Sequence, residues 1–592
     1  MSIKHLHFSA LLLGITLGGC SSVPTSPIAN TDKEDSSKSI QQTTDKPVEY
    51  PTRPFEAETL FDLLVAEVAG SRNEFSVALE KYTKQAFHTR DLNVVARATR
   101  ISSYLNANAN ALKLSQLWVE LDPEDLEARR LAAHYLTEFH QLPAALPHAI
   151  YMLEHGETDT LRTIAGYAAL ANNEQRQLLL DQYSTINEEW REHPDVLLTY
   201  ATLLNQQGEY DPAQQTTNRL IELEPLNESA RLLSCQIIEK QQGTDAALAS
   251  LEKSLELLPN SKLLLLHSAK LWTDKDINRS RQQLSKLVTL FPDDHQLVYS
   301  LALISLQMGL EQDGEILLRR VLESPQLATP AHFQLAKLNE RQGDTEQAIL
   351  HYRNVRSGQY LITSASRLSR LLALENRMEE ARIYLGELRN ENPRESGYLF
   401  QVEAEMLENN GQPQNAFTVL SQALVQFPNA EPLLYARSLL SERTGNMAAA
   451  EQDLRTILKN TPDNPTALNA LGYSLTINTN RYEEAHQLIS RALELKPDDP
   501  ATLDSLGWVL FKMGKHNQAL PYLQKAFEKF PDPEVAAHLG EVLWALNRRE
   551  EAASVWQQSL KDNPDSDIII STMERLEVPE QLQAPQPTTT VK

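Results

Sequence analysis

The hydrophobic positions of this 592-residue chain follow one repeating pattern, in which small side chains recur at an interval of about 34 residues. One series of small residues, interrupted by a single leucine, consists of Ala78, Ala111, Ala145, Leu179, Ala213, Ala247, Ser280, Gly314, Ala348, Ala381, Ala416, Ala450, Ala485, Ala519 and Ala552. A second series precedes it by about twelve residues and includes Ala66, Ala133, Ala201, Cys235, Gly472, Gly507 and Gly540. Glycine often stands about five residues before a member of the first series, and proline about twelve residues after it. Such an interval is typical of a repeat protein.

Each recurring residue type has a physical reason, and together they predict two helices per repeat. Two small side chains about twelve residues apart allow the two helices to cross closely. Glycine in a helix costs about 1 kcal/mol relative to alanine, so Gly472, Gly507 and Gly540 indicate crossings that need a very close approach. The glycine between the helices suits a left-handed residue at the end of the first helix. Proline ends the second helix because it cannot continue the hydrogen-bond ladder.

The best-preserved stretch, residues 465–531, holds two units that resemble tetratricopeptide repeats (TPRs), with the runs LNALGYSL and LDSLGWVLFKMGKHNQALPYLQKAFEKFPD. The resemblance implies an all-α fold, a right-handed superhelical solenoid of TPR helix-turn-helix repeats. We expect about fifteen units over 55–566, with a degenerate unit near 165–195 around Leu179. Residues 567–577 are expected to form a capping helix, and the Pro/Thr/Gln-rich residues 578–592 a disordered tail.

The first 19 residues have the pattern of a secretory signal, with Lys4 before an apolar run from Phe8 to Leu17. The signal ends in LGGC at Cys20, which resembles the lipobox of bacterial lipoproteins. This resemblance implies three acyl chains on the mature cysteine, enough to make release from a membrane very slow. The alternative is an ordinary cleavable signal with an incidental cysteine. Because Ser21 and not aspartate follows the cysteine, we expect the protein on the periplasmic side of the outer membrane.

Residues 20–54 are expected to be the lipidated cysteine and a disordered tether, because they are rich in Ser, Thr, Pro, Lys and Asp. A tether of this length has a root-mean-square reach of roughly 30 Å. After the N-terminus no run of eighteen or more apolar residues occurs, so the sequence predicts no membrane-spanning helix.

The chain is strongly acidic, with a formal net charge of −24. Such a surface repels nucleic acid and anionic lipid, and attracts a partner with a basic face. The two cysteines, Cys20 and Cys235, are too few for a disulfide framework. Cys235 occupies a small-residue position of its repeat, which predicts a buried packing residue and not a redox sensor.

The sequence contains no motif that indicates catalysis: no G-x-S-x-G elbow, no phosphate-binding loop with lysine and no H-E-x-x-H. Four histidines lie near one another along the chain, His134, His140, His148 and His155, but only His134 and Glu138 have a helical i,i+4 spacing. We therefore expect solvated or core-edge histidines, no metal, no cofactor and no enzymatic activity. The repeats leave no room for a catalytic domain.

Function is then expected in the groove lined by the first helices of the repeats. If Gly507 is the eighth residue of its unit, the ninth and twelfth positions face this groove. A tentative partner-binding site therefore combines aromatic anchors from three adjacent units with an amide that could bond to a peptide backbone: Asn469, Tyr473, Trp508, Phe511 and Trp544. The alternative is that these aromatic side chains pack between neighbouring repeats.

Taken whole, the chain resembles the large tetratricopeptide outer-membrane lipoproteins of Pseudomonas and its relatives, the LbcA family. The resemblance is strongest in the runs NALGYSL, LDSLGWV and AAHLGEVLWAL. It implies an adaptor that binds and activates a periplasmic carboxyl-terminal-processing protease and presents peptidoglycan hydrolases for degradation. A different function remains open on the sequence, an assembly factor for an outer-membrane secretin, pilus or polysaccharide export machine.

Overall fold

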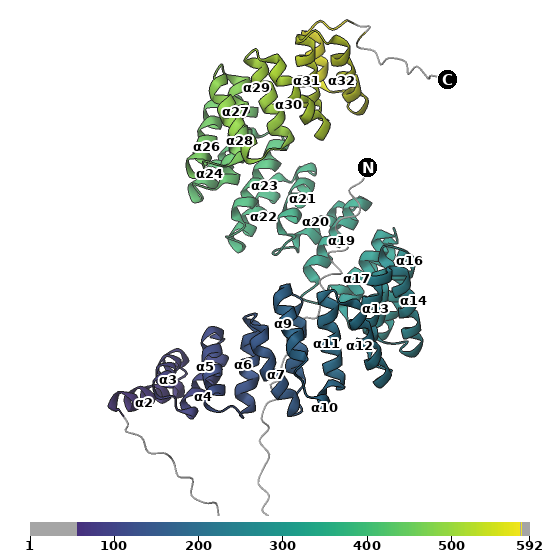
Figure 1. Cartoon of the computed structure of the whole chain (residues 1–592). Coiled ribbons are helices and arrows are strands. Elements are labelled where there is room, and N and C mark those ends of the chain that lie inside the picture. Colours follow the sequence, from purple (N-terminus) through teal and green to yellow (C-terminus); the bar gives the residue numbers. More distant parts are fainter. Residues whose placement is uncertain (1–55, 580–581, 583–592) are drawn as a thin grey trace, which may run out of the picture. The chain divides into compact units, whose positions relative to one another are not determined.

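The computed structural model describes residues 56–579 and residue 582. These residues form 32 α-helices and no β-strand. The helices belong to two compact units, the first ending at Met308 and the second beginning at Gly309 (Figure 1). Within each unit a helix packs mainly against its neighbours along the chain. The expected all-α solenoid of helix pairs is confirmed.

The first unit consists of α2 (Ala57–Ser71), α3 (Phe75–Thr89), α4 (Leu92–Tyr104), α5 (Asn108–Leu121), α6 (Leu126–Glu138), α7 (Leu142–Glu154), α8 (Asp159–Ala168), α9 (Asn173–Tyr183), α10 (Glu188–Arg191), α11 (Pro194–Gln207), α12 (Tyr210–Leu223), α13 (Glu228–Gln242), α14 (Thr244–Leu257), α15 (Lys262–Thr273), α16 (Ile277–Leu290) and α17 (His295–Gln307). None of the helices in the described part of the chain has both the length and the apolar character that crossing a membrane requires.

The second unit consists of α18 (Glu311–Val321), α19 (Ala328–Gln342), α20 (Thr345–Arg353), α21 (Leu361–Leu374), α22 (Met378–Glu391), α23 (Ser396–Asn409), α24 (Pro413–Gln426), α25 (Glu431–Arg443), α26 (Met447–Asn460), α27 (Pro465–Asn478), α28 (Tyr482–Leu495), α29 (Pro500–Lys512), α30 (His516–Lys529), α31 (Pro533–Ala545), α32 (Arg549–Asp562) and α33 (Asp567–Arg575). The predicted signal over 1–19, the lipidation site Cys20, the tether over 20–54 and most of the tail over 578–592 lie outside the described residues.

Helices of one pair cross where the sequence places its small residues. A Cβ atom added to Gly507 would lie 2.5 Å from Cγ of Leu523 and 3.2 Å from the carbonyl oxygen of Ala519 on the partner helix. At Gly472 the same atom would lie 3.0 Å from the carbonyl oxygen of Ala485. The prediction that these glycines serve a close crossing is confirmed.

In several pairs the residue between the two helices adopts the left-handed conformation, with φ between +73° and +90° at Gly208, Gly343, Gly411, Gly445 and Gly514. Five pairs without glycine at this place use asparagine or histidine, with φ between +54° and +62° at Asn73, Asn106, His140, Asn376 and Asn547. These side chains tolerate the left-handed region better than other non-glycine residues. In these five pairs the left-handed turn is kept without glycine, whereas the connections α15–α16 and α27–α28 contain no residue with positive φ.

The irregular stretch expected near 165–195 contains α8, α9 and the short helix α10. Leu179 is fully buried at the place where other repeats have a small residue. The helices α8 and α9 make their main contacts with α7 and α11 and not with each other. A leucine at the crossing prevents the close approach seen elsewhere.

The last repeat is covered by α33, which lies within the expected range 567–577. Ile569 is fully buried and Met573 nearly so, and Arg575 forms hydrogen bonds of 2.5 and 2.9 Å with Glu541 on α31. Val578, where the tail was expected to begin, is buried, and its amide donates to the carbonyl of Met573 at 3.0 Å. Val578 thus adds to the apolar side chains with which α33 covers the last repeat.

Cys235 is fully buried in the crossing of α13 and α14. Its Sγ lies 3.0 Å from the carbonyl oxygen of Ala247, the small residue of the partner helix. Burial, with a contribution from Glu239, raises the pKa of the thiol to about 12. The predicted packing role is confirmed, since a buried thiol held in its neutral form is a poor nucleophile.

Candidate partner-binding groove

A groove of about 490 Å³ runs along the first helices of four successive pairs in the second unit, α25, α27, α29 and α31. The side chains that give it its chemical character are Tyr435, Glu442, Asn469, Tyr473, Asp504 and Glu534. The connections before α29 and α31 complete the lining with Lys496, Asp499, Phe530 and Asp532.

The groove residues share one face of each first helix. When the small residue is numbered eight, most of them fall at positions two, five, six, nine and twelve, the spacing that places side chains on one side of a helix. Pro465, Thr502 and Val535, at positions one and three, complete the lining near the helix N-termini. The sequence prediction used only positions nine and twelve of the units, apart from Asn469 at position five. It therefore missed Tyr435, Asp504 and Glu534, at positions five and two, which the same register could have located. It also missed Glu442, which is at position twelve of a unit that the prediction did not include.

The groove is acidic, because its lining has five carboxylates and one lysine. Asp499 and Asp532 cap the N-termini of α29 and α31, accepting from the amides of Thr502 and Glu534 at 2.9 Å. The remaining carboxylates, Glu442, Asp504 and Glu534, lie beside Tyr473.

The hydroxyl of Tyr473 lies among the carboxylates of this groove, and its pKa is raised by burial and by them. Its hydroxyl donates to Glu534, two repeats further along the chain. Burial raises the pKa of Tyr473, and the negative charges of Glu534, Asp504 and Glu442 raise it further. Burial disfavours any charge, but the negative charges that add to this shift also favour a cationic group nearby.

Two acceptors in the groove have no hydrogen-bond partner, Oδ1 of Asn469 and Oε1 of Glu442. Both atoms are buried, and both residues line the groove. A buried acceptor without a donor costs about 1–3 kcal/mol. A bound segment that donates from its backbone or from a cationic side chain would recover part of this free energy.

The predicted site residues separate into two groups. Asn469 and Tyr473 line the groove, whereas Trp508 is buried beside it. The indole of Trp508 stacks on the imidazole of His538 from the next repeat, with ring centroids 3.9 Å apart. His538 in turn lies 3.0 Å from the carboxylate of Asp504. The alternative interpretation, packing between neighbouring repeats, therefore describes Trp508.

Phe511 and Trp544 are also absent from the groove lining and are partly buried against the core. Phe511 stacks on Trp508 with centroids 5.2 Å apart, and Trp544 lies 6.0 Å from Trp556 within its own helix pair. Aromatic residues at positions nine and twelve thus reach neighbouring side chains as easily as a partner. Position alone could not separate the two outcomes.

A second hollow on first helices of the same unit has mixed charge. It has a volume of about 670 Å³ between α21 and α23, and its lining includes Arg367, Arg370, Tyr398 and Glu405. Both guanidinium groups contact the carboxylate of Glu340. With Glu405 in the lining, the two positive charges are balanced, so this hollow differs from the acidic groove.

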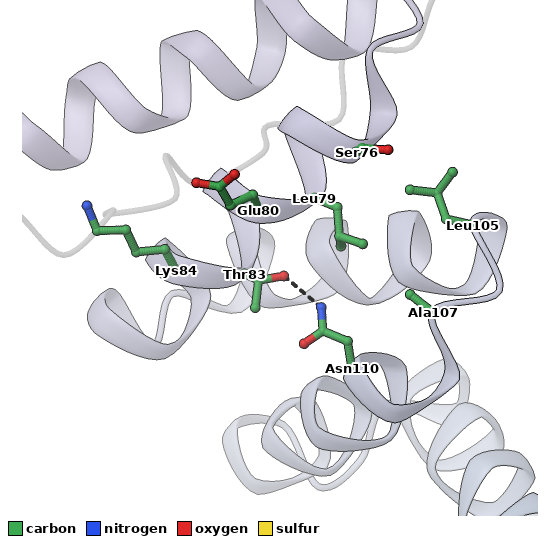
Figure 2. Close-up of a pocket in the computed structure, with 8 residues that line it drawn as sticks. All are labelled: Ser76, Leu79, Glu80, Thr83, Lys84, Leu105, Ala107 and Asn110. Atoms are coloured by element: carbon green, nitrogen blue, oxygen red, sulfur yellow. Dashed lines mark hydrogen bonds between the residues drawn. The ribbon is translucent and has the colours of Figure 1, made fainter.

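A third hollow, of about 620 Å³, lies in the first unit between α3 and α5 (Figure 2). Its polar side chains bond to one another or to adjacent helices: Asn110 donates to Oγ1 of Thr83 at 2.8 Å across the hollow, and Lys84 pairs with Asp62 at 2.8 Å. This arrangement joins two repeats and offers a ligand no charged group without a partner.

The four histidines named above each have separate neighbours. His134 lies 3.7 Å from Glu138, His155 bonds to the carbonyl of Tyr151 at 2.8 Å, and His140 packs against Tyr167. Burial, with a contribution from Arg129, lowers the pKa of His148 to about 4. In residues 56–579 no group of three or more histidine, cysteine or acidic side chains is arranged to hold a metal ion.

Comparison with known proteins places the chain in a family. A tetratricopeptide repeat model matches residues 430–564, which contain the acidic groove. The TPR repeat-containing protein PA4667 of Pseudomonas aeruginosa is 36% identical over 537 residues, which cover 89% of each chain.

Solved structures of repeat proteins are more distant. A tetratricopeptide repeat protein from Parabacteroides merdae is 17% identical with a TM-score of 0.33, covering 42% of this chain and 98% of that one. The hetero-tetramer Cut9-Hcn1 is 16% identical with a TM-score of 0.32, covering 88% and 96%. Such scores do not support a comparison of shape, and the assignment rests on the Pseudomonas relative. By that similarity over nearly its whole length, the chain belongs to the family of tetratricopeptide-repeat-containing proteins.

Proposed function

We propose that this protein is a non-catalytic lipoprotein scaffold on the periplasmic side of the outer membrane. It binds and activates a carboxyl-terminal-processing protease and presents peptidoglycan hydrolases to that protease. Membership of the TPR family makes the chain a protein-interaction scaffold, and proteins of this kind are generally not catalysts. The finer assignment is supported by the resemblance to the LbcA-family lipoproteins and by the LGGC run at Cys20.

The observation that carries the binding function is the acidic groove along α25, α27, α29 and α31. Its unpartnered acceptors, at Asn469 and Glu442, suit an extended segment that donates hydrogen bonds. Its charge suits lysine or arginine on that segment.

Affinity purification from envelope extracts tests the partner assignment. The full chain is compared with a variant carrying Glu442→Gln and Glu534→Gln, which keeps the groove's shape and removes two charges. A matched control carries Glu483→Gln and Glu550→Gln, exposed positions on the second helices α28 and α32. We expect the full chain to recover a serine protease and cell-wall endopeptidases. The groove variant should recover roughly ten-fold less of them, because each removed carboxylate weakens binding by about 1 kcal/mol or less.

The outcomes separate the two functions considered from the sequence. Recovery of secretin, pilus or exporter subunits without a protease would overturn the adaptor proposal. Equal loss in the groove variant and in the control would show that general surface charge, and not the groove, attracts the partner.

The anchor is tested separately. Cys20→Ala removes the thiol that would carry the diacylglycerol, so the protein should move from the membrane fraction to the soluble fraction. Fractionation with a known lipoprotein as internal standard measures this shift. Unchanged sedimentation with membranes would refute lipid anchoring and leave the groove proposal intact.

A further inference from the structure

An apolar stripe runs along the outer face of α2, the first helix of the first repeat. Its members are Leu60, Phe61, Leu64 and Val68, which are 49%, 63%, 57% and 49% exposed. Their spacing places them on one side of the helix. A terminal repeat normally presents a polar face to water, because an apolar one invites association.

Two of the four positions are covered in later repeats, whereas Leu60 and Leu64 hold the second and sixth positions, which line the groove in the second unit. Phe61 and Val68 are the third and tenth residues of their unit when Ala66 is the eighth. From α11 onward, the third and tenth residues of every first helix are at most 7% exposed, as at Val196 and Leu203. Within each unit, first helices such as α13 and α29 contact the second helix of the preceding repeat, α12 and α28 respectively. The face of α2 therefore has the residues that receive another helix.

Charge does not prevent that contact, because the carboxylates between the ends of α2 bond to α3. Lys84 lies 2.6 Å from Glu58 and 2.8 Å from Asp62, and Tyr82 donates to Glu67. The stripe is consequently bordered by carboxylates that already have partners. Association through the stripe would not have to break these bonds.

The stripe is symmetric about Leu64. Leu60 and Val68 lie four residues before and after it, and Glu56 and Arg72 lie eight residues before and after it. If two α2 helices packed antiparallel about a two-fold axis at Leu64, each Leu60 would face Val68 of the other copy. Each Glu56 would then face Arg72 of the other copy, so opposite charges meet at both ends.

We propose that a second copy of this chain covers the face of α2 through this antiparallel contact. The sequence that precedes α2 is a less suitable occupant, because Pro47, Pro51 and Pro54 are not compatible with the pattern of an amphipathic helix. An anionic membrane surface is disfavoured by the net charge of −24. One helix face is smaller than the roughly 800 Å² per partner of a stable interface, so the dimer is weak and concentration-dependent. It is independent of the partner that the acidic groove binds.

Photocrosslinking in the native envelope tests this proposal on the full chain. A benzoylphenylalanine at position 61 should yield an adduct that contains only this chain, at twice its mass. The matched control places the same group at Val425 on α24, which is 83% exposed, and should yield no such adduct. An adduct with another protein or with lipid at position 61, or no adduct, would overturn the proposal.

Charge reversal tests the register. Glu56→Arg or Arg72→Glu alone should reduce the homotypic adduct several-fold, and the double variant should restore it. Within one helix these residues are about 24 Å apart, so restoration can only come from a contact between copies. Failure of the double variant to restore the adduct would overturn the antiparallel pairing. Both residues are exposed, so neither change threatens folding.

Discussion

The apolar face of the terminal repeat is covered at one end of the repeat array and exposed at the other. At the C-terminal end α33 covers the last pair with Ile569 and Met573, and the chain continues as far as a buried Val578. At the N-terminal end α2 exposes Phe61 and Leu64 with no helix over them among the described residues. Repeats bury their apolar faces on neighbours, so each end needs its own solution. One end has a cap within the chain, and the other has a face suited to association.

This difference implies different energetics at the two ends. In the last pair, Gly540 lies against the indole of Trp556, which is fully buried, so packing there is tight. In the first pair, small buried residues such as Ala66 and Ala78 are accompanied by polar contacts such as Lys84 with Asp62. The following predictions test this contrast, from the largest expected effect to the smallest.

Trp556→Ala should destabilise the C-terminal end by about 3–5 kcal/mol, because it removes a large side chain from a fully buried place. Native-state hydrogen exchange of the amides in α31–α33 measures the effect locally, which suits a long repeat array. Amides of α2 and α3 serve as the internal control and should exchange as before. Unchanged protection of α31 would contradict the tight packing described for this end.

Gly540→Ala should destabilise the same end by about 1–3 kcal/mol, because its new methyl group would overlap the indole of Trp556. The matched control is Gly386→Ala within α22, where an added Cβ would come no closer than 3.7 Å to Arg389. That change should stabilise by about 0.5–1 kcal/mol, since alanine is the better helix former. Denaturant unfolding followed by circular dichroism compares the two, and equal signs would refute the close-crossing argument.

Acid should loosen the N-terminal end through Asp62. Its hydrogen bonds with Lys84 and Gln85 lower its pKa from 3.8 to about 2. The stabilisation is therefore present above about pH 3.8 and is lost as the pH falls toward 2. Amide protection in α2 should fall over this interval, and Asp62→Asn should flatten that dependence. If Asp62→Asn loses amide protection in α2 over the same pH interval as the unmodified chain, other carboxylates are responsible for the loss.

Most of the fold could be predicted from the sequence because each repeat imposes the same constraints. Gly507 is required by the close crossing, where a side chain would overlap Leu523, and Gly514 by a left-handed backbone conformation that few other residues adopt. Two details depart from the repeat pattern for reasons of their own. Asn547 adopts the left-handed turn in place of glycine. Val578 lies beyond the capping helix but is buried, because the end of the array accommodates one more apolar side chain.

The binding groove could be predicted only in part. Asn469 and Tyr473 line it, as the register suggested, but Trp508 is taken up by stacking on His538. Whether an aromatic side chain faces a groove or a neighbouring repeat depends on the residue opposite, which lies about 30 positions away along the chain. Helix register fixes the face of the helix, and the neighbour across the interface decides the contact.

Phe61→Ala should change the stability of the isolated monomer by about 0.5 kcal/mol or less, because its ring is largely exposed. The comparable change at the capped end, Met573→Ala, removes a buried side chain and should cost about 2–5 kcal/mol. Thermal unfolding at low protein concentration should show this contrast directly. Raising the concentration should then stabilise the unmodified chain but not Phe61→Ala, because self-association stabilises only the folded form that associates. A loss of more than about 1 kcal/mol at low concentration would mean that Phe61 is already packed within one chain, and the contrast between the two ends would be withdrawn.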